Sequence, residues 1–538
     1  MRCYSSPGVS QKQTNAITSE IAVIAFGMPI CYDLWLTQRI SRRVPGDLAM
    51  KPVRLASAVC ILVLATMACG DEKQVEPLFR SLDLNVGQSR TLHLPDQTSV
   101  TVKLLAIEEH RDPVRDALRG AALTVEVNGE HGTIPCATYN LPTELGGVRI
   151  DCPVIKGYLR SYSNYWAIES DARLRIWPKE GPLIRPGTFV YPVEQRWGAA
   201  STLFDNEIGD GELYGPERVY YHQGFDFGGA DRIVPIYAAT DGVVVSARGK
   251  SLDDIPDCVR PRYDVVYLCD PRGWYYRYSH FDSIDELVQV GGKVKIGQQI
   301  GVLGKEGGSG GWSHLHFELI RPQEDGKYGS DSIYAFLHQV YLAKNDEPVI
   351  AVARPQILGF AGRPIELDAS RSWSASDPDG MKYEWSFADG TKATGIKVRH
   401  VFAEPGRYRP TLKVTDRAGN VDYDFGKVTA ADPDMAPGQR CYLHAAYWPT
   451  KNIHAGDVVT FLVRSFRFKP VVGDEIWDFG DGSPTARTRS DGAVDHHNKN
   501  GYGRVTHRFE KPGDYIVTVR RSNDDGQWAV DKLDVRVK

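Results

Sequence analysis

The sequence lacks an excess of charge of either sign. Its 538 residues include 64 Lys and Arg side chains against 68 Asp and Glu, for a formal net charge of −4. Proteins that bind nucleic acids need a concentrated positive field to meet the phosphates, so this balance argues against strong binding of polyanions. A chain of this length is sufficient for three to five domains.

Long hydrophobic runs are also missing. The segment Ile21–Trp35 is partly apolar, but Pro29 and Asp33 interrupt it. A transmembrane helix needs about 20 predominantly apolar residues, and the next apolar run, Leu55–Ala68, is shorter than that. The sequence therefore does not predict a membrane-spanning helix in either segment.

The second apolar run has the features of an export signal. It follows the short basic segment Met50-Lys-Pro-Val-Arg54 and ends in Thr66-Met-Ala-Cys69. Small residues before a Cys resemble the lipobox of bacterial lipoproteins, in which that Cys is lipidated. We expect residues 50–69 to be a signal peptide, Cys69 to anchor an exported protein to a bacterial membrane, and residues 1–49 to be a mis-called upstream extension. Ordinary signal cleavage near Cys69 is the alternative.

Cysteine is sparse, with nine in the chain. An exported protein meets an oxidising compartment, where neighbouring cysteines form disulfides. We predict two local disulfides, Cys136–Cys152 and Cys258–Cys269, each contributing about 2–3 kcal/mol by closing a short loop. Cys441 is left unpaired.

What the chain has in quantity is glycine, proline and aromatic residues, with 52 Gly, 32 Pro and 26 Tyr. This composition favours short strands and turns over helices, so we predict a mainly β, multi-domain protein. Residues 76–185 alternate polar and apolar side chains and form an N-terminal β-rich domain of unassigned role. Residues 190–345 form an antiparallel β domain, with strands expected at Val234–Ala239, Gly242–Ala247, Tyr263–Leu268 and Trp274–Tyr278.

The C-terminal part contains a degenerate repeat. One copy has Trp385-x-Phe-x-Asp-Gly followed by His400-x-Phe, and the other has Trp477-x-Phe-x-Asp-Gly followed by His507-x-Phe. Each copy then continues with Pro-Gly-x-Tyr. The copies resemble PKD domains, which are β-sandwiches that act as spacers or adhesive modules, and we place them at 350–432 and 440–538. The Trp is expected in each core and the His in a structural hydrogen bond.

The histidines carry the chemistry. His314 and His316 lie two apart in a run that alternates polar and apolar residues, so both project from one face of a strand. His222 and Asp226 also share a face, and the glycines beside them disfavour a helix. A lone His-x-His is more often surface decoration, but two His and one carboxylate together are a ligand set for catalytic zinc with one position left for water. The remaining imidazoles can move protons or stabilise an oxyanion.

The order His222-x-x-x-Asp226, His280, His314-x-His316 resembles the LytM/lysostaphin-type zinc peptidases of family M23, over about residues 190–322. The resemblance implies one zinc ion on His222, Asp226 and His316. It implies that His280 and His314 are the catalytic pair beside the metal. It also implies hydrolysis of peptide cross-links in bacterial peptidoglycan.

Two stretches depart from the family pattern, Lys305–Trp312 and the loop Lys250–Tyr263, and both concern substrate preference. Tyr275, Tyr276, Tyr278 and Trp312 are candidates to line a groove for an extended peptide, although core packing is the expected use for at least two of them. The sequence also leaves open a non-catalytic envelope protein, either a regulator of wall hydrolases or an adhesin or scaffold that acts through its PKD-like domains.

Overall fold

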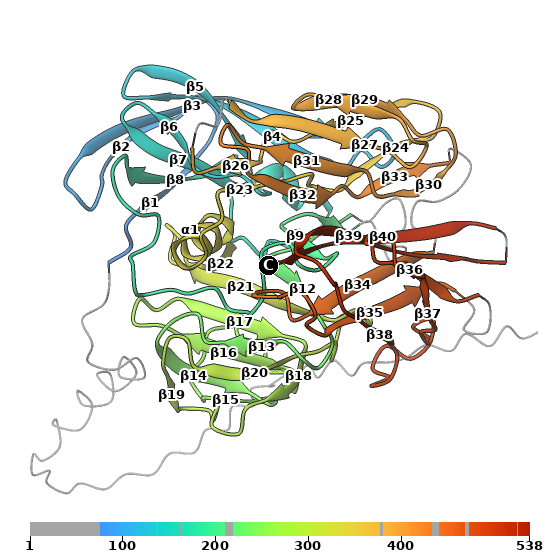
Figure 1. Ribbon diagram of the computed structural model, residues 1–538. Coiled ribbons are helices and arrows are strands. Elements are labelled where there is room, and N and C mark those ends of the chain that lie inside the picture. The colour runs from blue at the N-terminus through green and yellow to red at the C-terminus, as the bar shows by residue number, and fades with distance from the viewer. Residues whose placement is uncertain are drawn as a thin grey trace, which may run out of the picture. The chain divides into compact units, whose positions relative to one another are not determined.

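The computed structural model describes residues 76–136, 138–161, 163–209, 219–376, 380–432, 441–468, 473–524 and 526–538. The predicted signal peptide and Cys69 lie outside these ranges. Strands dominate the described chain, and α1 (Tyr334–Lys344) is the one α-helix within it (Figure 1). Among the described residues, no helix has the length and apolar character needed to cross a membrane. The prediction of a mainly β protein is confirmed.

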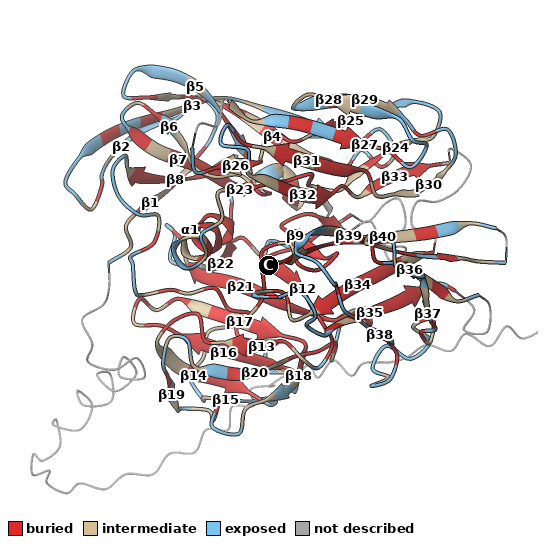
Figure 2. Cartoon of the chain, viewed as in Figure 1, coloured by how far each residue is buried: buried red, intermediate tan, exposed pale blue. Residues whose placement is uncertain are grey.

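The N-terminal domain is an eight-stranded sheet in the order β1-β8-β7-β5-β4-β3-β2, with β6 beside β7. Strand β3 alternates as predicted: Val100, Val102 and Leu104 are fully buried, whereas Ser99 and Thr101 are exposed. Figure 2 shows β2 as the most exposed strand of this sheet. The elements are β1 (Arg80–Leu84), β2 (Ser89–His93), β3 (Ser99–Arg111), β4 (Leu118–Val127), β5 (Glu130–Cys136), β6 (Thr143–Leu145), β7 (Val148–Ile155), the 3-10 helix η1 (Lys156–Ser161) and β8 (Ala172–Pro178).

No disulfide joins the five described cysteines, so the predicted pairs Cys136–Cys152 and Cys258–Cys269 are not formed in this structure. Cys136 and Cys152 are buried register partners on the parallel strands β5 and β7, and the Cys152 thiol donates to the carbonyl of Val154 at 3.4 Å. Cys258 is half-buried and Cys269 is buried, within one apolar cluster. The cysteines therefore pack as small apolar side chains, and the cores around them do not depend on a covalent link.

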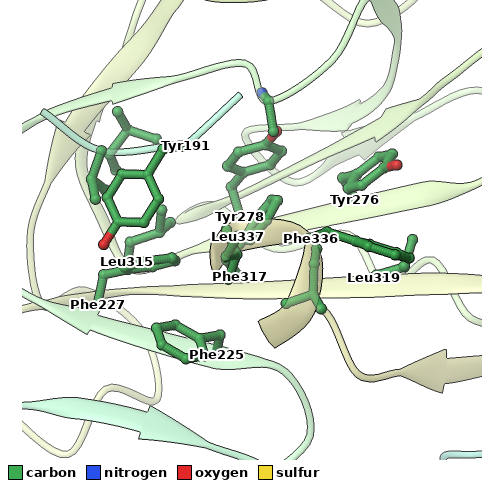
Figure 3. Packing of buried hydrophobic residues seen from close by; sticks show 14 of the residues in the cluster. Tyr191, Phe225, Phe227, Tyr276, Tyr278, Leu315, Phe317, Leu319, Phe336 and Leu337 are labelled. Carbon is green, nitrogen blue, oxygen red and sulfur yellow. The ribbon is translucent and has the colours of Figure 1, made fainter. Parts of the chain in front are cut away.

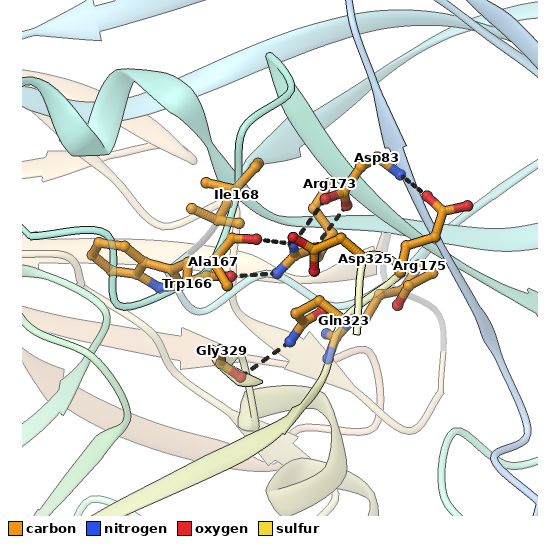
Figure 4. A network of polar contacts seen from close by, with 12 residues as sticks. Asp83, Trp166, Ala167, Ile168, Arg173, Arg175, Gln323, Asp325 and Gly329 are labelled. Atoms are coloured by element: carbon orange, nitrogen blue, oxygen red, sulfur yellow. Dashed lines mark hydrogen bonds and ion pairs between the residues drawn. The ribbon is translucent and has the colours of Figure 1, made fainter. Parts of the chain in front are cut away.

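Two buried arginines lie side by side on β8 (Figure 4): Arg173 bonds within the N-terminal domain, and Arg175 also bonds to the next domain. Arg173 binds Asp83 through two nitrogens at 2.7 and 2.8 Å and donates to the carbonyl of Trp166. Arg175 donates to the carbonyl of Ser332 at 2.6 Å, across the domain boundary. Loss of Asp83 would leave the buried charge of Arg173 without this carboxylate, whereas Arg175 also binds Asp151 at 2.9 and 2.5 Å.

The second domain is built on a nine-stranded sheet in the order β15-β14-β16-β17-β21-β12-β9, with β19 beside β14 and β22 beside β21. Three of the four predicted strands lie in it, as β14, β16 and β17. The fourth, predicted at Val234–Ala239, is the short β13 of a separate three-stranded sheet, β13-β20-β18, because it pairs with β20.

The bounds in this domain are β9 (Leu203–Asp205), β10 (Ile208–Gly209), β11 (Tyr220–Tyr221), β12 (Phe225–Gly228), β13 (Pro235–Tyr237), β14 (Gly242–Ala247), β15 (Lys250–Ser251), β16 (Val265–Cys269), β17 (Tyr275–Ser279), β18 (Phe281–Ile284), β19 (Lys293–Val294), β20 (Gln299–Leu303), β21 (His314–Pro322) and β22 (Tyr328–Asp331). Aromatic side chains fill its core (Figure 3): Phe225, Phe227, Tyr276, Tyr278 and Phe317 are fully buried there. Tyr276 and Tyr278 are thus packing residues and do not line a groove.

Two β-sandwiches follow. The first contains sheets β28-β27-β31-β32, β24-β33-β30 and β25-β29, with the pair β23-β26, and the second contains β37-β36-β39-β40 and β34-β35-β38. The strands are β23 (Val349–Ile350), β24 (Ile357–Phe360), β25 (Pro364–Asp368), β26 (Trp373–Ser374), β27 (Lys382–Ser386), β28 (Lys392–Thr394), β29 (Lys397–Val401), β30 (Gly406–Tyr408), β31 (Thr411–Thr415), β32 (Val421–Phe425), β33 (Val428–Ala431), β34 (Tyr442–Trp448), β35 (Val459–Phe466), β36 (Glu475–Asp478), β37 (Ala486–Thr488), β38 (Gly503–His507), β39 (Gly513–Ser522) and β40 (Trp528–Val537).

The repeated motif has a structural role in both copies. Trp385 and Trp477 are buried in their cores, as predicted. His507 binds Asp481 at 2.7 Å and stacks on a Phe ring of the preceding turn at 3.9 Å. His400 takes the matching place, 3.4 Å from Asp389 and stacked at 3.8 Å on the equivalent Phe ring. The paired histidines therefore anchor a strand to a turn in each sandwich.

The sandwiches are bonded directly to the second domain. Arg196 binds the carboxylate of Asp534 on β40 at 2.9 Å, and Arg354 donates to the carbonyl of Leu203 on β9 at 2.7 Å. Because these guanidinium groups are buried, the contacts are part of the packed interior.

Candidate active site

Strand β21 divides its side chains between two faces. Leu315, Phe317 and Leu319 point into the aromatic core, as Figure 3 shows. The alternate residues, His314 and His316, therefore lie on the opposite face. The antiparallel register sets Asp226 of β12 directly opposite His316, so a carboxylate and an imidazole become cross-strand neighbours.

A glycine brings His222 over this face. Gly224 has a φ of +88°, and a Cβ at this position would lie 2.7 Å from the carbonyl oxygen of Phe317. The chain can therefore turn tightly between β11 and β12 only with glycine at 224. The backbone N–H of His222 donates to the carbonyl of Glu207 at 2.8 Å, which fixes the start of the turn.

Three side-chain atoms converge as a result. The distance is 2.9 Å from His222 Nε2 to His316 Nδ1, and Asp226 Oδ1 lies 3.0 Å from each nitrogen. All three residues are buried. A tetrahedral zinc site with ligand distances near 2.1 Å has its ligand atoms about 3.4 Å apart, so a small adjustment makes room for the ion.

The donor set suits a divalent cation. Burial raises the pKa of Asp226, but the neighbouring His222 and His314 outweigh it and hold the pKa well below the usual value. The carboxylate is therefore ionised, and each imidazole can present a lone pair to the same point. Glu318 lies 3.6 Å from the far nitrogen of His316, where a carboxylate orients a metal-bound imidazole. These residues fit a zinc ion.

His280 and His314 flank the cluster. Their ring centroids lie 4.6 Å apart, and His314 Nε2 is 3.6 Å from Asp226 Oδ2. Each Nδ1 lies next to a backbone carbonyl, that of Glu306 for His280 at 2.7 Å and that of Trp312 for His314 at 2.9 Å. These contacts favour the tautomer with a proton on Nδ1, which leaves Nε2 of each ring as a base. Burial lowers the pKa of both imidazoles.

Two further residues, Asp264 and Trp312, support the histidines, and Asp264 carries no sequence signal. Asp264 lies 3.4 Å from His280 Nδ1 and accepts a hydrogen bond from the His280 backbone N–H. His280 itself has a left-handed backbone conformation, with φ +73°. Burial raises the pKa of Asp264, but His280 and Arg262 outweigh burial and lower the pKa to about 2. Trp312 stacks on His314 with ring centroids 3.7 Å apart. Trp312 is among the candidates named from the sequence to line a peptide groove, whereas no residue spacing in the sequence predicts the role of Asp264.

The second sandwich holds the loop in front of His314. The backbone N–H of Ser313 donates to the hydroxyl of Tyr502 at 2.7 Å, and Tyr502 in turn lies 3.0 Å from His444 Nδ1. Arg464 donates to the carbonyl of Gly311. Residues more than 150 positions along the chain thus position the first residue of β21.

Comparison with known families agrees with this geometry. Residues 220–328 match the model of peptidase family M23. Residues 345–429 and 445–537 each match a PKD domain. The M23 match contains His222, Asp226, His280, His314 and His316.

Among solved structures, Helicobacter pylori Csd3 is similar at 14% identity, covering 48% of this chain and 81% of that chain with a TM-score of 0.19. Fibronectin(III)-like modules of Clostridium thermocellum CbhA are similar at 12% identity, covering 35% and 94% with a TM-score of 0.14. These low TM-scores support no argument about fold or function. The family matches do: the chain carries a domain of peptidase family M23 followed by two PKD domains, as the sequence motifs predicted.

Proposed function

We propose that this protein is a zinc-dependent endopeptidase that hydrolyses peptide cross-links of bacterial peptidoglycan at the cell envelope. The observation that carries the proposal is the convergence of His222, Asp226 and His316 within 3.0 Å of one another, with two further imidazoles beside them. Five side chains with this chemistry seldom meet in a buried site without a function.

Three of these residues would bind the metal ion, and the other two would transfer protons. His222, Asp226 and His316 would hold the ion, and a bound zinc supplies a Lewis acid that activates water and polarises a peptide carbonyl. His280 and His314 keep Nδ1 against backbone carbonyls, so each Nε2 can accept a proton from water, donate to the developing oxyanion, or protonate the leaving amine. The two imidazoles share these duties.

The decisive experiment combines metal analysis with digestion of purified sacculi and mass analysis of the released fragments. The wild-type protein should bind one zinc and release peptide fragments. His314→Ala should keep its zinc and lose turnover, while His93→Ala, a change on an exposed strand, should retain both. Near-normal digestion by His314→Ala at full zinc occupancy would contradict the assigned role.

Zinc binding without hydrolysis of any peptide would instead favour the alternative, a non-catalytic regulator in the envelope. The envelope location itself is part of the proposal and rests on the lipobox-like residues before Cys69. Labelled fatty acid should be incorporated into the wild-type protein and not into Cys69→Ala. Equal labelling of the two proteins would refute lipid attachment at this residue.

A further inference from the structure

A cavity of about 300 Å³ opens beside the candidate metal site. His222 and Asp226 line one part of it, and Trp312 lines another. Both PKD domains supply further walls, including residues of β33 and of β34. A ligand that fills this cavity would therefore contact the peptidase-family domain and both PKD domains.

His444, on β34 of the second PKD domain, forms part of the cavity wall. The residue is buried, with 3% of its surface exposed. Its ring centroid lies 5.9 Å from that of Trp312, and the indole of Trp312 stacks on His314 at 3.7 Å. One indole ring therefore separates His444 from a candidate catalytic imidazole, so His444 lies near the reacting centre without belonging to the metal cluster.

The hydrogen bonds around His444 determine which of its ring nitrogens carries the proton. The backbone N–H of Ser313 donates to the hydroxyl oxygen of Tyr502 at 2.7 Å. That hydroxyl keeps its own hydrogen to donate, and His444 Nδ1 lies 3.0 Å from the hydroxyl oxygen. Nδ1 is then the acceptor, so the neutral ring carries its proton on Nε2.

The Nε2–H group of His444 is a buried donor without an acceptor. Nε2 has no hydrogen-bond partner among the residues that the structure describes. Burial, with the nearby cations Lys427, Arg409 and Arg464, lowers the pKa of His444 to about 3, so the ring stays neutral at neutral pH. An unpaired buried donor is costly and uncommon in folded proteins, which points to a ligand that accepts this hydrogen bond.

We propose that His444 is a substrate-binding residue, and that its Nε2–H donates a hydrogen bond to a backbone carbonyl of the bound peptide. The inference rests on the proposed peptidase function and adds a substrate contact made by the second PKD domain. Every peptide offers carbonyl acceptors along its backbone, and a neutral donor suits a neutral acceptor. The second PKD domain then takes part in substrate binding, in addition to any spacer role.

The test measures which peptide carbonyls contribute to binding. The probe is the cross-link peptide of the sacculi, sequenced after muramidase digestion and labelled with a fluorophore. It is prepared as a set of analogues in which each amide carbonyl in turn is replaced by a methylene. Fluorescence anisotropy gives the Kd of each analogue for zinc-loaded His314→Ala. At least one analogue should bind about fivefold or more weakly than the parent peptide, because it leaves the His444 donor buried without an acceptor.

A second substitution assigns that loss to His444. In the double variant His314→Ala, His444→Phe, the ratio of Kd between one of these analogues and the parent peptide should fall toward one, since no donor remains to be left unpaired. His314→Ala, His454→Phe is the matched control, because His454 is an exposed histidine of the same PKD domain, and it should keep every ratio. A merely structural effect of His444→Phe would weaken all the peptides alike and leave their ratios unchanged.

NMR supplies a readout that needs no turnover. Spectra of protein with isotope-labelled histidine, in which the His444 signals are assigned by their loss in His444→Phe, should show the Nε2–H tautomer at neutral pH. The Nε2–H resonance should shift when the peptide binds. An Nδ1–H tautomer, or ratios unaffected by His444→Phe, would overturn the proposal and leave the peptidase function intact. If sacculi are not digested, the peptidase function fails, and the anisotropy and NMR data still decide whether His444 binds a peptide carbonyl.

Discussion

Replacing Tyr502 with Phe tests whether the second PKD domain positions the catalytic loop. The Tyr502 hydroxyl accepts the buried N–H of Ser313, which directly precedes His314. Phe keeps the ring and removes only the oxygen. The Ser313 N–H would then be buried without a partner, and His314 would lose one of the constraints on its position.

The expected magnitude follows from the cost of an unsatisfied buried donor, about 1–3 kcal/mol. If this free energy is added to the activation barrier of the reaction, kcat decreases by about 5- to 150-fold. KM should change less, because Tyr502 is not among the residues that line the cavity beside His222 and Asp226. Zinc content should remain at the wild-type level, since the three converging atoms are not touched.

Tyr515→Phe is the matched control. Its hydroxyl donates one hydrogen bond to the carbonyl of Lys511 at 2.8 Å, at an exposed position of the same domain. Steady-state kinetics on the cross-link peptide and metal analysis should be run on both variants. Equal kcat values for Tyr502→Phe and Tyr515→Phe would refute the argument that the PKD domain positions His314.

Three further predictions concern the metal cluster, its turn and the acid stability of the fold. Asp226→Asn should purify without zinc, because the neutral amide supplies no charge to the cluster, and full zinc occupancy would contradict the ligand assignment. Gly224→Ala should lower the free energy of unfolding by more than Gly273→Ala, since both have positive φ but only the first Cβ would meet the Phe317 carbonyl; equal losses in chemical denaturation would show that the turn tolerates a side chain. Burial lowers the pKa of His338 to about 4, so the unfolded chain takes up the proton first and stability should fall by up to about 3 kcal/mol as the pH drops from 6.5 to 4. His338→Phe should lose less stability over that interval, and an unchanged pH dependence of the melting temperature would refute this.

The parts of the site that sequence could predict are those encoded by local spacing. The alternation around His314 and His316 fixes a shared face of a strand, and glycines beside Asp226 signal a turn. Antiparallel register then brings the carboxylate opposite an imidazole, as the structure shows. The same local logic located Trp385 and Trp477 in the sandwich cores.

The features of the site and the fold that the sequence did not predict depend on long-range packing. Only the tertiary fold brings Asp264 to His280 and Tyr502 to Ser313, and the neighbours of Asp264 and Tyr502 in sequence form no motif. Cys136 and Cys152 were correctly expected to be close, yet proximity alone does not decide between a disulfide and two packed thiols. The cavity beside His222 and Asp226 takes part of its wall from both PKD domains, so no single segment of the sequence predicts it.

The buried bonds from Arg196 to Asp534 and from Arg354 to Leu203 also bear on how such a chain can change during evolution. A module joined by an exposed linker can be duplicated, exchanged or lost without cost to its neighbour. Here the PKD domains share interior bonds with the domain that holds the candidate site, and they supply walls of the cavity beside His222 and Asp226. Exchanging a PKD domain would therefore require compensating changes in the residues that line this cavity.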